Sequence, residues 1–238
     1  MRIGIAGLGL IGGSLALALG DQHDVIAYDP AGTRKVASSA TLAGLLPADI
    51  VIVATPLDAI VPTLAALAAL AGEAVLLDVG SVKRAVAGYA VTAPTAARIV
   101  GGHPMAGSTG SGFAAARADL FRDRPFLLVP TARSDDAAMA MAGDLARAIG
   151  AIPTVVSAEV HDRAVAMLSG LPLLISRALA AAGADVADLA GPGFRDMTRL
   201  AATPRPLADA MLAGNADEIR VALRAFRTAL DDAERELG

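Results

Sequence analysis

Three glycines near the start of the chain constrain its fold more than any other feature. Gly7, Gly9 and Gly12 have the spacing G-x-G-x-x-G, between an apolar run at residues 2–6 and another at 15–19. In dinucleotide-binding folds the first glycine allows a tight turn, the second lets a pyrophosphate approach the backbone, and the third lets a helix pack close to a strand. Free N–H groups at the start of that helix favour phosphate. The residues expected to contact the cofactor here are Gly7, Leu8, Gly9, Leu10, Ile11 and Gly12.

A carboxylate follows at the distance that this fingerprint predicts. A second strand is expected over Val25–Tyr28, and it ends at Asp29, about 20 residues past the fingerprint. A carboxylate at this place binds a ribose hydroxyl and repels a 2′-phosphate, which favours NAD over NADP. The alternative is a glycine-rich turn of an unrelated α/β protein, with Asp29 as a helix cap. The order strand, turn, helix, strand and aspartate favours the dinucleotide site.

Strand and helix patterns alternate as far as residue 156, which predicts a Rossmann-type, doubly wound α/β domain over 1–156. Fully apolar runs indicate strands that are buried on both faces. A helix is expected over Ser134–Ile149, with Ser134 as its cap. Further strands are expected at residues 50–54, 74–79, 98–100, 125–130 and 152–156.

Beyond Ser157 the strand patterns end, and residues 157–238 are expected to form an all-helical domain, whose apolar and amphipathic helices indicate a dimer. One long helix is expected over 158–182, with a kink near 169–171 because Pro172 follows. The terminal helix is expected to carry its apolar residues on one face. These apolar residues are Val221, Leu223, Phe226 and Leu230.

Composition excludes several classes of protein. The chain is 55% hydrophobic, but glycines interrupt the uncharged run at 3–20, and Pro56, Asp58 and Pro62 interrupt the run at 50–71, so we expect no membrane span. A net charge of −4 and 3% aromatic residues argue against a nucleic-acid partner. The absence of cysteine excludes a thiolate metal site and fits a cytoplasmic protein. We expect no metal.

Polar residues follow three successive predicted strands, at the edge where open α/β sheets bind ligands. Thr55 and Pro56 end the first of these strands, and Ser81 follows the second. His103 follows the third in a stiff loop, and as one of only three histidines it is the candidate base. Ser81 either orients substrate and histidine or caps the next helix.

The helical half offers two further candidates. His161 and Asp162 open its first helix, where such a pair usually makes a surface or interhelical hydrogen bond. Arg199 either pairs with Asp196 at i,i+3 or binds a substrate carboxylate with its planar guanidinium.

Four motifs together resemble the prephenate dehydrogenase and arogenate (cyclohexadienyl) dehydrogenase family of tyrosine biosynthesis. They lie in order along nearly the whole chain, and His161-Asp162 also fits. The motifs are Gly7-Leu8-Gly9-Leu10-Ile11-Gly12-Gly13-Ser14, Asp78-Val79-Gly80-Ser81-Val82-Lys83, Gly102-His103-Pro104-Met105-Ala106-Gly107-Ser108 and Gly193-Phe194-Arg195-Asp196-Met197-Thr198-Arg199.

The resemblance implies an NAD-dependent oxidative decarboxylation, with prephenate preferred and arogenate as the alternative, in a homodimer formed through the helical domain. It implies that His103 deprotonates the ring hydroxyl, that Ser81 places histidine and hydroxyl, and that Arg199 binds a substrate carboxylate. Further residues that match the family's site are His161, Ser108 and Gly193 near the substrate, and Thr55 and Pro56 near the nicotinamide ribose.

The chain also departs from some relatives. Thr109-Gly110 stands where some carry an acidic gating residue, and Ala208 where some carry tryptophan, so gating and side-chain specificity stay open. The length leads us to expect neither a fused chorismate mutase nor a regulatory ACT domain.

Two other functional hypotheses compete with this one. A β-hydroxyacid or imine reductase would commonly use a lysine in the helical domain, and 157–238 has none. An NAD-sensing module would bind NAD without turnover.

Overall fold

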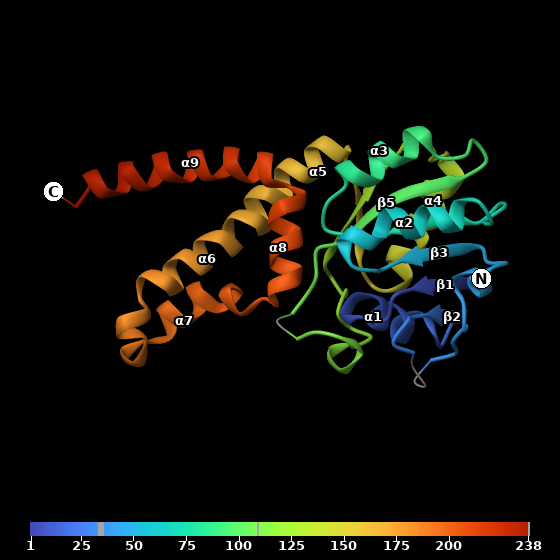
Figure 1. Cartoon of the computed structure of the whole chain (residues 1–238), viewed down its shortest axis with the longest axis horizontal. Helices are drawn as coiled ribbons and strands as arrows, with labels where there is room; N and C mark the ends of the chain where they lie inside the picture. The colour runs from blue at the N-terminus through green and yellow to red at the C-terminus, as the bar shows by residue number, and fades with distance from the viewer. Residues whose placement is uncertain (33–35, 109, 238) are drawn as a thin grey trace. The chain divides into compact units, whose positions relative to one another are not determined.

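The computed structural model describes residues 1–32, 36–108 and 110–237, which form two compact units. These are Met1–His161 and Asp162–Gly238. The units divide inside a helix, α5 (Ala158–Val165), whereas the expected boundary at 156/157 lies just before it. The first unit contains the sheet, and the described part of the second is helical (Figure 1).

A seven-stranded sheet in the order β2-β1-β3-β4-β5-β6-β7 forms the centre of the first unit. The strands from β2 to β5 run parallel, and this confirms the predicted Rossmann-type fold. Strand β6 runs antiparallel to β5, which the sequence patterns did not predict, and β7 runs parallel to β6. The strands are β1 (Arg2–Ala6), β2 (Asp24–Tyr28), β3 (Ile50–Val53), β4 (Val75–Asp78), β5 (Arg98–Pro104), β6 (Pro125–Val129) and β7 (Ile152–Val155).

Helices cover both faces of this sheet because alternate strand residues point to opposite sides. In β3, Ile50 and Ile52 join the core formed with α1 and α4, while Val51 and Val53 join the core formed with α2 and α3. This explains why the strand is an uninterrupted apolar run. The helical elements of the first unit are α1 (Leu10–Leu19), η1 (Leu42–Leu45), α2 (Leu57–Ala68), α3 (Arg84–Thr92), η2 (Phe113–Ala115) and α4 (Asp136–Ala148), followed by α5.

Strand β5 is longer than predicted and changes the setting of His103. It continues to Pro104, and its last four residues pair with β6, so the prediction of a loop around His103 was wrong. The two glycines before His103 reflect close packing. A Cβ at Gly102 would lie 2.7 Å from the Asp78 carbonyl oxygen, and one at Gly101 would lie 3.1 Å from the Lys83 side chain. Glycine inside a strand here marks the close approach of neighbours.

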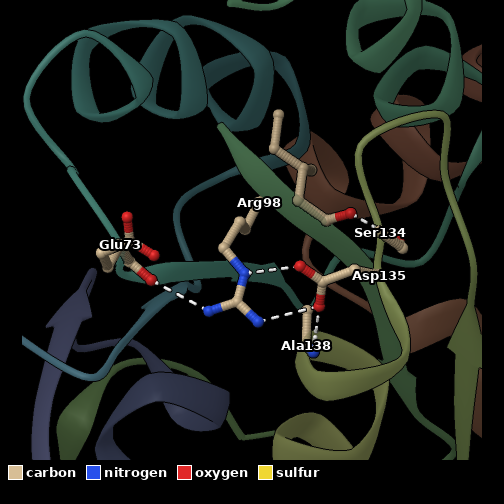
Figure 2. Close-up of polar contacts among 6 residues, drawn as sticks. Glu73, Arg98, Ser134, Asp135 and Ala138 are labelled. Carbon is tan, nitrogen blue, oxygen red and sulfur yellow. Dashed lines mark hydrogen bonds and ion pairs between the residues drawn. The ribbon is translucent and has the colours of Figure 1, made fainter. Parts of the chain in front are cut away.

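An ion pair at the amino-terminal end of β5 links three segments of the first unit (Figure 2). Arg98 donates to both carboxylate oxygens of Asp135, at 2.9 and 2.8 Å, and to the carbonyl oxygen of Glu73 at 3.1 Å. Asp135 also accepts from the Ala138 N–H and is the N-cap of α4, so the expectation of Ser134 as the cap was wrong. The Ser134 hydroxyl instead donates to the Ile99 carbonyl oxygen.

The second unit continues the helix that begins with α5. A π-helical turn, η3 (Ala166–Gly170), joins α5 to α6 (Leu171–Ala182). The predicted irregularity is therefore present as a wider turn just before Pro172, which lacks an N–H donor. By length and composition alone, Ala158–Ala182 could cross a membrane, a property shared by core helices of soluble proteins. The other elements are η4 (Ala184–Leu189), α7 (Pro192–Thr198), η5 (Arg199–Ala202), α8 (Arg205–Gly214) and α9 (Ala216–Arg235).

Helix α9 buries a face that differs in part from the predicted one. Ile219 and Ala222 are buried, and Leu223 and Phe226 pack against them. The four residues follow the spacing i, i+3, i+4 and i+7 of one helical face. Val221 lies off this face and is 51% exposed, so its predicted place on the apolar face was wrong.

Candidate functional site

The glycine turn between β1 and α1 has the shape that the fingerprint predicts. Gly7 has φ = 95°, in the left-handed region that favours glycine. A Cβ at Gly12 would lie 1.9 Å from the Gly7 carbonyl oxygen, so only glycine lets the helix approach the strand this closely. A Cβ at Gly9, the N-cap residue, would face open space. The turn therefore leaves room for a ligand beside Gly9 and closes it off beside Gly12.

The first turn of α1 presents backbone donors at this opening. The first helical hydrogen bond runs from the Gly13 N–H to the Gly9 carbonyl oxygen, at 2.9 Å, so the N–H groups of the preceding residues have no intrahelical acceptor. Leu8 is buried, and Leu10 and Ile11 pack against the core. These apolar side chains anchor the turn and leave its backbone to meet a ligand.

Asp29 stands beside the glycine turn at the end of β2. Its carboxylate accepts the Leu8 N–H at 2.8 Å and the Ala31 N–H at 2.9 Å. Tyr28 pairs with Ala6 across the sheet, so Asp29 and Gly7 each follow a paired residue at the same edge. A short turn follows Asp29, and no helix begins there in the described residues, so the helix-cap alternative for Asp29 is not observed. Its role toward ribose stays a prediction.

The sheet register brings the three predicted strand ends together. Val53, Asp78 and Gly101 lie side by side on β3, β4 and β5. Two residues further along the chain from each come Thr55, Gly80 and His103. Thr55, Ser81 and His103 therefore meet at the same carboxyl edge as the glycine turn. Pro56 follows Thr55 as the N-cap residue of α2.

Two hydroxyl groups at this edge have no hydrogen-bond partner among the described residues. They are Thr55 Oγ1 and Ser81 Oγ, and both oxygens are buried. A buried polar atom without a partner costs about 1–3 kcal/mol, and such groups are often completed by a ligand or water. The N-cap alternative for Ser81 was wrong, because Lys83 is the N-cap residue of α3 and no side chain caps that helix. Ser81 therefore has its hydroxyl available at the site.

A second histidine lies against His103. His103 Nδ1 is 3.0 Å from Nε2 of His161 on α5, and the two rings are tilted by 56°. His161 is fully buried, which rules out the surface contact that is usual for such a residue. Burial lowers the pKa of His103 well below its usual range, and the neighbouring His161 and Lys83 lower it further. The His103 imidazole is therefore neutral near pH 7 and able to accept a proton.

A buried ion pair that the sequence reasoning missed lies behind His103. The Lys83 ammonium pairs with the Asp78 carboxylate and donates to the Gly102 carbonyl oxygen at 2.7 Å. Both side chains are essentially inaccessible to solvent. Burial, only partly offset by Lys83, raises the pKa of the Asp78 carboxyl. Asp78 and Lys83 lie on either side of Ser81 in one sequence motif. Their position next to a candidate site residue could have identified them as candidates for the site.

The comparisons with known proteins agree with this geometry. A family model described as prephenate dehydrogenase, nucleotide-binding domain, matches residues 20–155. A model described as prephenate dehydrogenase, dimerization domain, matches residues 157–238. The chain belongs to the prephenate dehydrogenase family.

The chain is similar to prephenate and arogenate dehydrogenases. The prephenate dehydrogenase of Bacillus subtilis (strain 168) is 33% identical over 90% of this chain, which spans 64% of that protein's length. A Synechocystis arogenate dehydrogenase is 33% identical, with a TM-score of 0.83 over 98% of this chain and 90% of its own. The A. aeolicus prephenate dehydrogenase in complex with hydroxyphenyl propionate and NAD⁺ is 23% identical and shares the fold, with a TM-score of 0.91 over 100% and 91% of the two chains.

Ser108, Gly193 and Arg199 are the remaining substrate-binding candidates in this prephenate dehydrogenase family member. Ser108 is exposed on the loop after β5, where its hydroxyl accepts the Gly110 N–H at 3.1 Å. Thr109 lies outside the described residues. In the helical unit, Gly193 belongs to the first turn of α7, and Arg199 begins η5 with an exposed side chain. Their substrate-binding roles stay predictions.

Two interpretations of the helical unit change. Neither Asp196 nor Arg199 takes part in an ion pair with any described residue, so the helix-face pair that would explain Arg199 is not observed. Ala208 is buried in α8, so a tryptophan would not fit there without repacking. Within the described ranges, no group of three potential metal ligands occurs.

Proposed function

We propose that the chain catalyses the NAD-dependent oxidative decarboxylation of prephenate to 4-hydroxyphenylpyruvate in tyrosine biosynthesis. The observation that carries the proposal is the neutral His103 imidazole at the same sheet edge as two buried hydroxyls that have no hydrogen-bond partner among the described residues. Arogenate is a second candidate substrate, because the similar Synechocystis enzyme is an arogenate dehydrogenase. Prephenate and arogenate differ in a keto or amino group on the side chain.

The residues at the glycine turn fit NAD. The backbone from Gly9 to Gly12 would hold the pyrophosphate, and the Asp29 carboxylate would accept a ribose hydroxyl. The unpartnered Thr55 hydroxyl, next to Pro56, would contact the nicotinamide ribose. When bound, NAD⁺ supplies the hydride acceptor. The negative charge of Asp29 disfavours the 2′-phosphate of NADP.

The His103–His161 contact is compatible with the tautomer that catalysis requires. If His103 carries its hydrogen on Nδ1, it donates to His161 Nε2, and its own Nε2 is free to accept the proton of the ring hydroxyl. As the hydroxyl carbon becomes a carbonyl, the Ser81 hydroxyl can donate to its oxygen. Loss of carbon dioxide then returns an electron pair to the ring and makes it aromatic. The resulting phenolate oxygen can take its proton back from His103 Nε2.

The helical unit would supply a carboxylate contact and the subunit interface. Arg199 is our candidate for a substrate carboxylate, because an exposed guanidinium that pairs with no described carboxylate can bind it bidentately. Several large apolar side chains of this unit are exposed, as expected for a surface that a second copy covers in a homodimer. They include Leu168, Val186, Leu189 and Leu230.

Production of NADH by the purified protein tests the proposal. The assay supplies NAD⁺ with either prephenate or arogenate, and a His103→Asn variant serves as the comparison. We expect NADH from one of these substrates and a fall in kcat of about 10²–10⁴-fold in the variant, with unchanged NAD affinity. If NAD binds but neither substrate gives NADH, the dehydrogenase proposal fails and the NAD-sensing module becomes the better account.

A further inference from the structure

Lys83 occupies a position where a lysine is energetically costly. Its side chain is fully buried on the turn between β4 and α3. Removing an ammonium group from water costs several kcal/mol, and a buried ion pair often contributes no more stability than apolar residues of the same volume. Stability alone therefore does not account for a buried Lys83–Asp78 pair at this edge of the sheet.

The contacts of Lys83 join the two segments that carry the candidate catalytic groups. Its ammonium pairs with Asp78 and donates to the Gly102 carbonyl oxygen, one residue before His103. The same Asp78 oxygen accepts the Gly80 N–H at 2.9 Å, one residue before Ser81. One buried ion pair thus holds the backbone at the residue before Ser81 and at the residue before His103.

The glycines of β5 make this arrangement possible. A Cβ at Gly101 would lie 3.1 Å from the Lys83 Cδ atom, so any side chain there would push against the lysine stem. A Cβ at Gly102 would lie 2.7 Å from the Asp78 carbonyl oxygen and 2.9 Å from Leu77. Both glycines give up side-chain packing where β5 passes the ion pair. The local sequence is therefore adapted to keep Lys83 against the strand.

We propose that Lys83 is a positioning residue for His103: its ammonium, anchored by Asp78, holds the Gly102 carbonyl and so fixes the His103 imidazole relative to the Ser81 hydroxyl. This inference rests on the proposed function, since it assigns a role in that reaction. Lys83 itself touches neither substrate nor cofactor in this scheme.

The position of Lys83 also has an electrostatic consequence at His103. The charged and titratable groups around the His103 ring are His161 on α5 and Lys83, with Asp78 on β4 facing the ammonium. A nearby cation disfavours the imidazolium form. Removal of Lys83 should therefore raise the pKa of His103, a change that can be followed without turnover.

The test uses the full chain with Lys83→Met and with Asp78→Asn/Lys83→Met. The single variant leaves Asp78 buried without its cation and is expected to be unstable. The double variant removes both charges. Its methionine fills the space of the aliphatic part of the Lys83 side chain, and its asparagine keeps an acceptor for the Gly80 N–H. Arg84→Met is the matched control, because it removes an exposed cation from the next position of the same turn.

We expect kcat of the double variant to fall by about 10–100-fold, with the KM for NAD within about twofold of wild type and Arg84→Met unchanged. Imidazole NMR of the three histidines, assigned with His103→Asn, should show the His103 pKa rising in Lys83→Met and rising less in the double variant, where loss of the carboxylate offsets loss of the ammonium.

A folded double variant with wild-type kcat, or an unmoved His103 pKa in Lys83→Met, would overturn the inference. The NMR measurement does not depend on turnover. If the wild-type chain proves inactive toward both substrates, the proposed function fails, whereas the His103 titration still decides whether Lys83 acts on that imidazole. If Lys83→Met does not fold, the double variant's kcat and its His103 titration decide the question.

Discussion

Alanine at two glycines of the first turn should separate folding from nucleotide binding. In Gly12→Ala the new Cβ would lie 1.9 Å from the Gly7 carbonyl oxygen, so α1 must retreat by about 1.5 Å to reach ordinary contact at 3.4 Å. Forcing a methyl group into a packed site costs about 1–3 kcal/mol. Alanine returns up to about 1 kcal/mol through its higher helix propensity. The expected net loss in free energy of unfolding is about 1–2 kcal/mol.

Gly9→Ala is the matched variant. Its Cβ meets no heavy atom within 4 Å, and the backbone at φ = −70° accepts any residue, so the free energy of unfolding should change by less than about 0.5 kcal/mol. The same methyl group occupies the space that the pyrophosphate needs. We expect the Kd for NAD to rise by about tenfold or more, which corresponds to about 1.4 kcal/mol of binding free energy.

Urea unfolding followed by circular dichroism and calorimetric titration with NAD measure the two effects separately. If Gly9→Ala binds NAD as tightly as wild type, the turn is not the phosphate-binding element. If Gly12→Ala unfolds at the wild-type urea concentration, the close helix–strand approach is not required for stability. Either result would refute the structural role that we assign to the glycine at that position.

Two further predictions concern charged residues. The Arg98 guanidinium holds the pKa of Asp135 at about 2, so the stabilisation is present above the unfolded value near pH 3.9 and is lost as the pH falls toward 2. Arg98→Met should lower the Tm at neutral pH, and the difference from wild type should shrink over that interval; a pH-independent difference would contradict the ion-pair explanation (Figure 2). Arg199→Gln should raise the KM for the acid substrate by roughly tenfold to a hundredfold, because a hydrogen bond to a charged group contributes about 1.5–3 kcal/mol. NADH assays with NAD titrations check this, and a raised Kd for NAD instead would assign Arg199 a different role.

Local patterns predicted the elements that local physics determines. The run Ile50-Val51-Ile52-Val53 is apolar at every position because helices cover both faces of the sheet, and it was readable as a buried strand. The glycine turn was predictable because two of its requirements are local: Gly7 has a positive φ, and Gly12 packs against the Gly7 carbonyl oxygen. The α4 cap was misassigned by one residue because Ser134 and Asp135 are both good N-cap residues. Only the tertiary contact of Asp135 with Arg98 distinguishes them.

The surroundings of His103 depend on contacts that no local pattern reports. His103 meets His161 across 58 positions, and Lys83 meets the Gly102 carbonyl across 19. The Lys83 contact requires the register of β4 with β5, and the run of β5 to Pro104 depends on pairing with the antiparallel β6. Gly101-Gly102 was interpreted as a loop because glycine weakens a strand. In the folded chain the same glycines make room for the Lys83 stem and the Asp78 backbone. The misplaced end of β5 and the oversight of Lys83 therefore have a single cause. A glycine can end a strand or make room for a neighbouring side chain, and the tertiary contacts determine which of the two occurs.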